Sequence, residues 1–356
     1  MTIVAQSRSY VIGVDCHART HTYAIIDPRT GELLGCEQFP TTPSGISRAT
    51  SWAARRTGGD ASTLWAIEGV AMYGAQLARA VAETGFDVVE APRTSAKARH
   101  GIGKSDPIDA RMIAAATLGL DDTQLRRPRQ DTGGRAALRT LVAARDMMAG
   151  ERTMNIIALT ALLRVNDLGV DARKSLTRTQ IATVSKWRER TETLEVQIAR
   201  AEAVRLARRI RELNDQLAVN KADLVLLIKN SPAAPVLEEP GVGPITAAMV
   251  LTAWSHRGRI RSEAAFAALA GVSPIPASSG NTSRHRLNRG GDRRLNQALH
   301  MAVVNRIQYD PDTRAYVTRR MAQGHSKREI LRILKRYLAR QLFRTLNALH
   351  DVPATA

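Results

Sequence analysis

The sequence has little cysteine, few aromatic residues and no long apolar segment. Its 356 residues include two cysteines, Cys16 and Cys36, which exclude a disulfide framework and cannot by themselves form a four-ligand zinc site. So few cysteines are typical of a protein from a reducing compartment. No apolar run approaches the roughly 18 residues that cross a bilayer, and the N-terminus lacks a signal-peptide pattern. We therefore expect a cytoplasmic protein without a membrane partner.

Acidic residues are scarce relative to basic ones. The chain has 33 Asp plus Glu against 52 Lys plus Arg, a formal net charge of +19, and the basic excess is spread along its whole length. This distribution favours a polyanionic partner, most simply nucleic acid. A protein that only coats nucleic acid would carry the same charge, so charge alone does not indicate catalysis. With 44% hydrophobic residues, the chain is long enough for two or three domains.

The first 125 residues alternate between strand-like and helix-like patterns. Short β-type runs over 10–39, separated by turn chemistry such as "DPRTGE", predict three antiparallel strands. Helices and strands then alternate up to a helix at 105–118, which predicts an α/β domain with a mixed sheet over 8–125. Charged residues, proline and glycine interrupt the pattern at 120–134 and indicate a domain boundary.

The remainder is predicted to be all-α. Residues 135–229 contain little proline or glycine and have apolar residues at three- and four-residue spacing, which predicts long helices. The apolar repeat is interrupted between Ala201 and Leu206, which favours a helical hairpin or short coiled coil over a continuous zipper. This segment either dimerises the protein or only separates two domains. Prolines end it before Gly241, and 235–350 is predicted to be mainly helical. The predicted fold class is therefore α/β plus all-α.

Carboxylates follow two predicted strands where each apolar run ends. Asp15 closes "YVIGVD" and Glu68 closes "TLWAIEG". Such an acid is costly unless it reaches solvent or a cation, and open α/β sheets bind ligands beyond strand ends. In "KSDPIDAR", Asp106 and Asp109 share one face of a helix. In the competing interpretation the first two acids only enter loops, while Asp106 caps the helix before Pro107 and Asp109 complements its dipole.

Together the four acids predict a metal site. Clustered carboxylates repel one another unless a cation neutralises them, and oxygen ligands in this number suit Mg²⁺ or Mn²⁺. Two such ions stabilise the attacking and leaving oxygens of phosphoryl transfer, so the expected chemistry is phosphodiester cleavage. His17 is either an extra ligand or a turn residue. Lys104 and Arg111 either neutralise a phosphate near the acids or are surface charges.

Two further motifs point to nucleic-acid contacts in the C-terminal part. In "PGVGPITAAMVL", Gly241 and Gly243 fit a helix-hairpin-helix whose amides approach a phosphate, although a plain helix–helix turn also uses glycine. In "ASSGNTSRHR", Ser278 or Ser279 could bring a hydroxyl to a phosphate, although Ser-Ser-Gly is typical of any flexible loop. The basic residues nearby that would balance phosphate charge are Arg284, Arg286, Arg289, Arg293 and Arg294.

The chain resembles, nearly end to end, the DEDD-type transposases of insertion-sequence family one-ten, which are bridge-RNA-guided serine recombinases with a RuvC-like domain. The resemblance lies in ordered stretches over about 300 residues: "IGVD", "IEGVAMY", "KSDPIDAR", "PGVGPITA", "FAALAGVSP", and "SSG" followed by "RGGDRRL". The chain departs from the family pattern at Asn296, where an arginine is common, and after Glu68, where Gly-Val replaces Ala-Thr.

This resemblance implies a RuvC-like, ribonuclease H-like domain over 8–125, whose acids bind two Mg²⁺. It also implies a coiled-coil segment over 135–229 and a transposase domain with a helix-hairpin-helix over 235–350. It places the catalytic serine at Ser279, with Ser278 as the alternative, and implies that this serine forms a phosphoserine link to DNA.

The resemblance further implies that the acids and the serine come from different protomers of a dimer or tetramer. A bridge RNA encoded by the element would pair with both donor and target DNA. The alternative is a RuvC-like endonuclease that hydrolyses branched DNA with the four acids alone. A third interpretation is a nucleic-acid binder without enzymatic activity.

Overall fold

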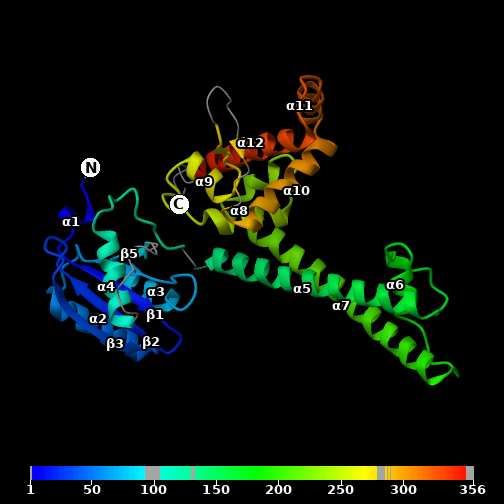
Figure 1. Ribbon diagram of the computed structural model, residues 1–356, viewed down its shortest axis with the longest axis horizontal. Coiled ribbons are helices and arrows are strands. Elements are labelled where there is room, and N and C mark those ends of the chain that lie inside the picture. Colours follow the sequence, from blue (N-terminus) through cyan, green and yellow to red (C-terminus); the bar gives the residue numbers. More distant parts are fainter. Residues whose placement is uncertain are drawn as a thin grey trace. The chain divides into compact units, whose positions relative to one another are not determined.

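The computed structural model describes residues 2–92, 105–129, 133–278, 285–286, 288 and 290–349, with only the backbone given for His285. The chain divides into two compact units, Met1–Gln130 and Asp131–Ala356 (Figure 1). The finer division into 8–125, 135–229 and 235–350 stays a prediction.

The first unit contains a five-stranded sheet in the order β3-β2-β1-β4-β5. Strands β1, β2 and β3 are antiparallel neighbours, and β4 and β5 run parallel to β1. The strands are β1 (Val11–Cys16), β2 (Thr20–Ile26), β3 (Leu33–Pro40), β4 (Leu64–Ile67) and β5 (Asp87–Glu90). The sequence correctly predicted a mixed sheet that begins with a three-stranded antiparallel meander.

Helices cover both faces of this sheet because side chains alternate along each strand. Ile12 and Val14 pack with α2 (Pro43–Thr57) and α3 (Ala75–Glu83). Val11, Ile26 and Leu64 point the other way, toward α4 (Asp106–Thr117). A short α1 (Val4–Ser7) precedes the sheet. The alternation therefore directs Asp15 toward α4, whereas Cys16 packs against the core on the α2 and α3 side.

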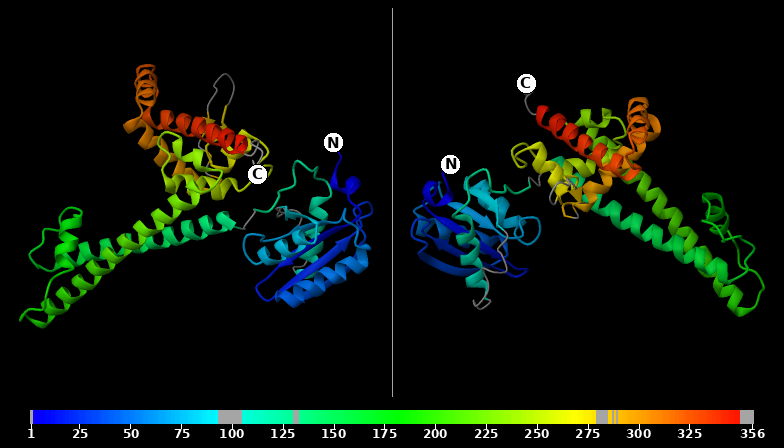
Figure 2. Two further views of the ribbon diagram at one scale, coloured as in Figure 1. Left: turned by 180° about the vertical axis from the view of Figure 1, so that it is seen from behind. Right: turned by 45° about the horizontal axis from the view of Figure 1, so that its top comes forward.

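The second unit begins with two long helices that pack side by side, α5 (Gly133–Val165) and α7 (Leu194–Lys229); Figure 2 shows them from two further directions. The short α6 (Arg178–Val184) covers one end of the pair. The two helices form a helical hairpin, one of the two arrangements that the sequence favoured, but the interruption of the apolar repeat between Ala201 and Leu206 does not mark its turn. Helix α7 runs through 201–206 without interruption, and the chain reverses over 166–193 instead, where Gly169 has a φ of +81°.

The rest of this unit is a helical bundle around Trp254, Phe266, Leu299 and Leu342. Its helices are η2 (Ala234–Glu238), α8 (Pro244–Trp254), α9 (Glu263–Leu269), α10 (Arg293–Tyr309), α11 (Pro311–Ala322) and α12 (Lys327–Ala348). A two-stranded ribbon, β6 (Ile275–Pro276) and β7 (His285–Arg286), projects from it. Among the described residues, no helix is long and apolar enough to cross a membrane.

Candidate metal centre and nucleic-acid contacts

Asp15 lies near the end of β1, opposite Thr22 of β2, with only 5% of its surface exposed. The parallel pairing of β1 with β4 brings the ends of these two strands together. The backbone amide of Glu68, the residue after β4, donates to the carbonyl oxygen of Val14 at 3.0 Å. Asp15, near the end of β1, and Glu68, just after β4, therefore lie at the same end of two neighbouring parallel strands, as the sequence predicted.

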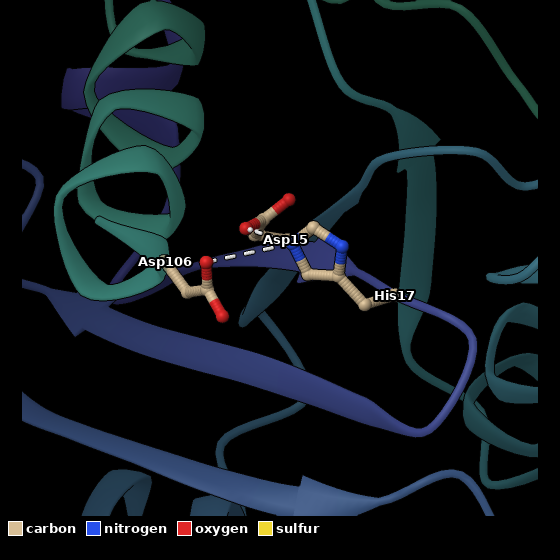
Figure 3. A group of neighbouring side chains, drawn as sticks. All are labelled: Asp15, His17 and Asp106. Atoms are coloured by element: carbon tan, nitrogen blue, oxygen red, sulfur yellow. Dashed lines mark hydrogen bonds and ion pairs between the residues drawn. The ribbon is translucent and has the colours of Figure 1, made fainter. Parts of the chain in front are cut away.

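Asp106 is the first residue of α4, and its side chain is directed toward β1 (Figure 3). The competing interpretation, in which Asp106 caps the helix, is wrong, because Ser105 occupies the N-cap position and its carbonyl oxygen accepts from the amide of Asp109 at 2.9 Å. Pro107 consequently occupies the second helical position. Proline is tolerated there because the amides of the first helical turn have no partner within the helix, so its missing N–H breaks no hydrogen bond. Because its carboxylate does not cap the helix, Asp106 can serve as a metal ligand.

His17 joins the two carboxylates. Its Nε2 atom lies 3.1 Å from Oδ2 of Asp15 and 3.6 Å from Oδ1 of Asp106 (Figure 3). One ligand atom from each of these residues lies within 4.8 Å of the other two. His17 belongs to the turn between β1 and β2, as one interpretation held, yet the same turn presents its ring to both acids.

Gln38 and Thr22 support the cluster and were not singled out from the sequence. Gln38 Nε2 donates to Thr22 Oγ1 at 3.2 Å and to Asp106 Oδ2 at 3.5 Å. The strand register places Asp15, Thr22 and Gln38 in one row across the sheet. Nothing in the sequence around Gln38 distinguishes it, because the row exists only once the register of three strands is known.

The remaining two predicted acids lie on the same elements as this cluster or on neighbouring ones. Glu68 is exposed at the end of β4, and Asp109 is half-buried, one turn beyond Asp106 on α4. Neither belongs to the group of three whose ligand atoms converge among the described residues. The structure thus brings Asp15, His17 and Asp106 together. It places Glu68 after the strand next to that of Asp15, and Asp109 on the same helix as Asp106.

Electrostatics around the cluster favour hard ligands. Burial raises the pKa of the Cys16 thiol well above its usual range, and the charges of Asp15 and Glu68 raise it further. Cys16 therefore stays a neutral thiol, and it packs on the other side of the sheet. The donors that remain are carboxylates and one imidazole, a set that suits Mg²⁺ or Mn²⁺. A nearly buried carboxylate such as Asp15 also gains from a cation.

The glycines of the predicted helix-hairpin-helix have different surroundings. Gly241 has a φ of +78°, and a β-carbon there would lie 2.3 Å from the carbonyl oxygen of Ala302, so close packing against α10 explains this glycine. Gly243 is the N-cap of α8 and has open space around it. The structure therefore gives Gly241 a packing role, whereas Gly243 leaves room for an incoming group.

The basic residues of the second unit differ in their surroundings. Arg286 is exposed on β7, and Arg293 and Arg294 are exposed in the first turn of α10. Arg294 Nε lies 2.7 Å from Oδ2 of Asp146 on α5, so it already has an acidic partner.

The other predicted residues divide into two groups. Arg111 is exposed on α4, and Ser278 is exposed two residues after β6. The predicted residues that lie outside the described part of the chain are Lys104, Ser279, Arg284 and Arg289.

A mixed sheet of this strand order, with acids at the ends of adjacent strands and on a covering helix, fits a ribonuclease H-like domain of the DEDD class. Family comparisons agree. A transposase model of the DEDD IS110 type matches residues 12–165, and a model of the transposase IS116/IS110/IS902 family matches residues 233–318. The chain belongs to the IS110 family of DEDD transposases.

Two curated relatives come from insertion elements. The chain is 33% identical over 144 residues to the IS110 uncharacterized 43.6 kDa protein of Streptomyces coelicolor, a match that covers 40% of this chain and 35% of that protein. It is 25% identical, over an alignment of 359 positions, to the IS900 uncharacterized 42 kDa protein of Mycobacterium paratuberculosis, covering 88% of this chain and 89% of that protein. The chain thus spans about a third of the first relative and most of the second.

Proposed function

We propose that the protein is a metal-dependent transposase that cleaves and rejoins DNA strands. The single observation that carries this function is the convergence of Asp15 and Asp106 around His17 at the edge of the sheet. Membership of a transposase family supports DNA as the substrate. The four proposed metal-binding and catalytic acids are Asp15, Glu68, Asp106 and Asp109.

The acids would hold two Mg²⁺ ions, with Mn²⁺ as a substitute. When bound, the ions supply stabilisation of the attacking and leaving oxygens in phosphoryl transfer. The protein's own part is positional: β1 and β4 fix Asp15 and Glu68, and α4 fixes Asp106 and Asp109. His17 holds Asp15 and Asp106 close to each other through its Nε2 atom.

Ser279 is the proposed nucleophile, with Ser278 as the alternative. The serine Oγ forms a bond to phosphorus while the bond from phosphorus to the 3′ oxygen of DNA breaks, and the serine proton ends on the leaving oxygen. The resulting 5′-phosphoserine conserves the ester bond, so the strand can rejoin without ATP. The family resemblance supports this role, and Ser278 of the same segment is exposed.

Three partners complete the proposal. The net charge of +19 suits nucleic-acid partners. The first is DNA, both donor and target, and the second is an element-encoded bridge RNA. Gly243, with open space at the start of α8, supports a helix-hairpin-helix contact to the DNA backbone. Exposed apolar side chains on the helical pair, such as Ile157, Leu194 and Ile198, support a coiled-coil contact in a dimer or tetramer.

Two substitutions test the catalytic roles separately. We expect Asp15→Asn to abolish strand cleavage while salt-dependent DNA affinity stays unchanged, because affinity comes mainly from Lys and Arg. We expect Ser279→Ala to abolish the covalent protein–DNA adduct trapped on denaturing gels and to leave Mn²⁺ binding intact, with Ser278→Ala as its matched control. An adduct lost in Ser278→Ala instead would move the nucleophile by one residue.

The alternative is a RuvC-like endonuclease that hydrolyses branched DNA with the acids alone. The acid cluster lies wholly within the first unit, which favours this alternative, because hydrolysis would need no residue from the second. Undiminished recombination by Ser279→Ala and Ser278→Ala, with no adduct in the wild type, would reject the serine mechanism.

Sequencing RNA that copurifies with the protein tests the bridge RNA, and light scattering with and without nucleic acid tests the oligomer.

A further inference from the structure

A cavity of about 710 Å³ lies in the second unit. The residues that line it are far in the sequence from the acid cluster. It is lined by residues from the first half of α12, by the 271–274 turn and by Arg286 of β7. The full set of ionisable side chains among the described residues that line it is Arg286, His325, Glu329, Arg332, Lys335, Arg336 and Tyr337. Four guanidinium or ammonium groups therefore face one carboxylate.

The one carboxylate of this lining is committed to the start of α12. Glu329 accepts from the backbone amide of Ser326 at 2.8 Å and from its hydroxyl at 2.9 Å, which completes a capping box. These hydrogen bonds lower the pKa of Glu329, so the group stays ionised. Its carboxylate is thus occupied at the helix end, and much of the basic charge of the cavity remains unneutralised.

The innermost cations hydrogen-bond to neutral groups. Lys335 Nζ donates to Asn296 Oδ1 at 3.1 Å, and Arg336 Nη1 donates to the hydroxyl of Ser273. Asn296 is itself fixed, because its amide nitrogen donates to the carbonyl oxygen of Ala270 at 2.7 Å. Burial lowers the pKa of Lys335, and repulsion from Arg332 lowers it further. These side chains are thus held in place with their charge available, which costs free energy unless an anion binds.

The cavity also lies at the base of the ribbon that leads to the candidate nucleophile. Pro274 and Arg286 line it, Ile275 pairs with Arg286, and β6 ends at Pro276. Ser279 follows Pro276 by three residues, which span at most about 10 Å of extended chain. An anion held in the cavity is therefore within a few nucleotides of any phosphodiester that the serine attacks.

We propose that this cavity binds a backbone phosphate of the DNA strand that the serine attacks, with Arg332, Lys335 and Arg336 as its main ligands. The assignment rests on the proposed transposase function. Arg332 and Arg336 are one turn apart on α12 and Lys335 lies beside them, so the three can surround one phosphate. Arginine forks suit phosphate oxygens, and Lys335 adds a point charge. The site reads the backbone rather than the base sequence.

The test measures affinity and needs no catalysis. In the full-length protein carrying Asp15→Asn, binding of a fluorescent single-stranded DNA of random sequence is measured over a range of salt concentrations. Each of Arg332→Gln and Lys335→Met is expected to weaken binding and to reduce the slope of log affinity against log salt by about 0.7. Arg328→Gln is the matched control, because Arg328 is exposed on the same helix and does not line the cavity.

Two further arms make the result decisive. Thermal unfolding midpoints establish that Lys335→Met folds, and Arg332→Gln alters an exposed side chain, so folding does not limit that variant. An RNA of the same length and random sequence is measured in parallel. Unchanged slopes in both cavity variants, an equal change in Arg328→Gln, or a change confined to RNA would each overturn the assignment. The proposed function is tested separately, by comparing DNA cleavage in the wild type and in Asp15→Asn. It would still stand after such a result if Asp15→Asn abolished cleavage.

Discussion

A β-carbon added to Gly13 would lie 2.1 Å from the carbonyl oxygen of Ala110 and 2.5 Å from the backbone nitrogen of Ala114. Helix α4 therefore rests directly on β1, backbone against backbone, two residues before Asp15 and one turn after Asp106. No other residue type fits at position 13 without moving the helix. This contact sets the separation between the strand that carries Asp15 and the helix that carries Asp106.

Gly13→Ala should consequently damage the candidate metal centre without altering any of its proposed ligands. The added methyl group must push α4 away from β1, which costs about 1–3 kcal/mol of stability and separates Asp106 from Asp15. We expect weaker Mn²⁺ binding and reduced DNA cleavage, measured together with hydrogen exchange of the β1 amides. Gly119→Ala is the control, because Gly119 has no atom within 4 Å of an added β-carbon. Wild-type Mn²⁺ affinity in Gly13→Ala would contradict this role.

His17→Ala distinguishes two roles for the imidazole between the acids. If His17 contributes a ligand, its loss should weaken Mn²⁺ affinity by about tenfold, within the range seen when a group that supports a metal site is removed. If it serves only as a cation that a metal displaces, the loss should strengthen Mn²⁺ binding. We expect the first outcome, since Nε2 lies within reach of both carboxylates. Titration calorimetry with His300→Ala as control measures the difference.

The sequence predicted the elements of the first unit well because its strands are short apolar runs bounded by turn residues. It also located Asp15 and Glu68, since an acid that ends a buried strand contradicts its surroundings. It could not decide whether the helix is capped at residue 105 or 106, because the sequence signals are nearly the same: Ser105 and Asp106 are both good caps, and Pro107 is accepted in either register.

The sequence could not reveal features that depend on distant segments meeting. Gln38 supports Asp106 only through the pairing of three strands, and the basic cavity arises where α12, the 271–274 turn and β7 come together. The turn between α5 and α7 was not located from the sequence, because its signals, Asn166, Asp167 and Gly169, are few and stand within a long segment of helical apolar spacing.

Asn220 should stabilise the pairing of α5 with α7. It is buried, its amide nitrogen donates to the carbonyl oxygen of Leu141 at 3.0 Å, and its oxygen accepts from Arg145 at 3.3 Å. Asn220→Ala removes both hydrogen bonds between the helices, although Arg145 still donates to the carbonyl oxygen of Leu217 at 3.0 Å, and we expect a loss of about 1–3 kcal/mol in unfolding free energy. Urea denaturation followed by circular dichroism measures it, with the exposed Gln216→Ala as control. Equal midpoints for the two variants would show that the buried amide contributes nothing.

Asp87 should make the stability of the first unit depend on pH. Its Oδ2 lies 2.7 Å from Arg8 and its Oδ1 lies 2.9 Å from Arg127, so it ties β5 to two flanking segments. Burial raises the pKa of Asp87, but the hydrogen bond from Arg8 and the charges of Arg127 and Arg8 outweigh burial, and the pKa falls below its usual value. Because the folded pKa lies below that of the unfolded chain, the stabilisation is complete above about pH 4 and is lost as the pH falls through the folded value.

Asp87→Asn should therefore be less stable than the wild type at pH 6, and the difference should shrink at acidic pH. The side chain is 40% exposed, so solvent screening limits the difference to roughly 1 kcal/mol or less. Hydrogen exchange of the β4 and β5 amides between pH 3 and 6 measures it within this unit, with the exposed Glu83→Gln as control. A difference that grows as the pH falls would reverse the sign of the linkage and contradict the assignment of Arg8 and Arg127 as the partners that matter.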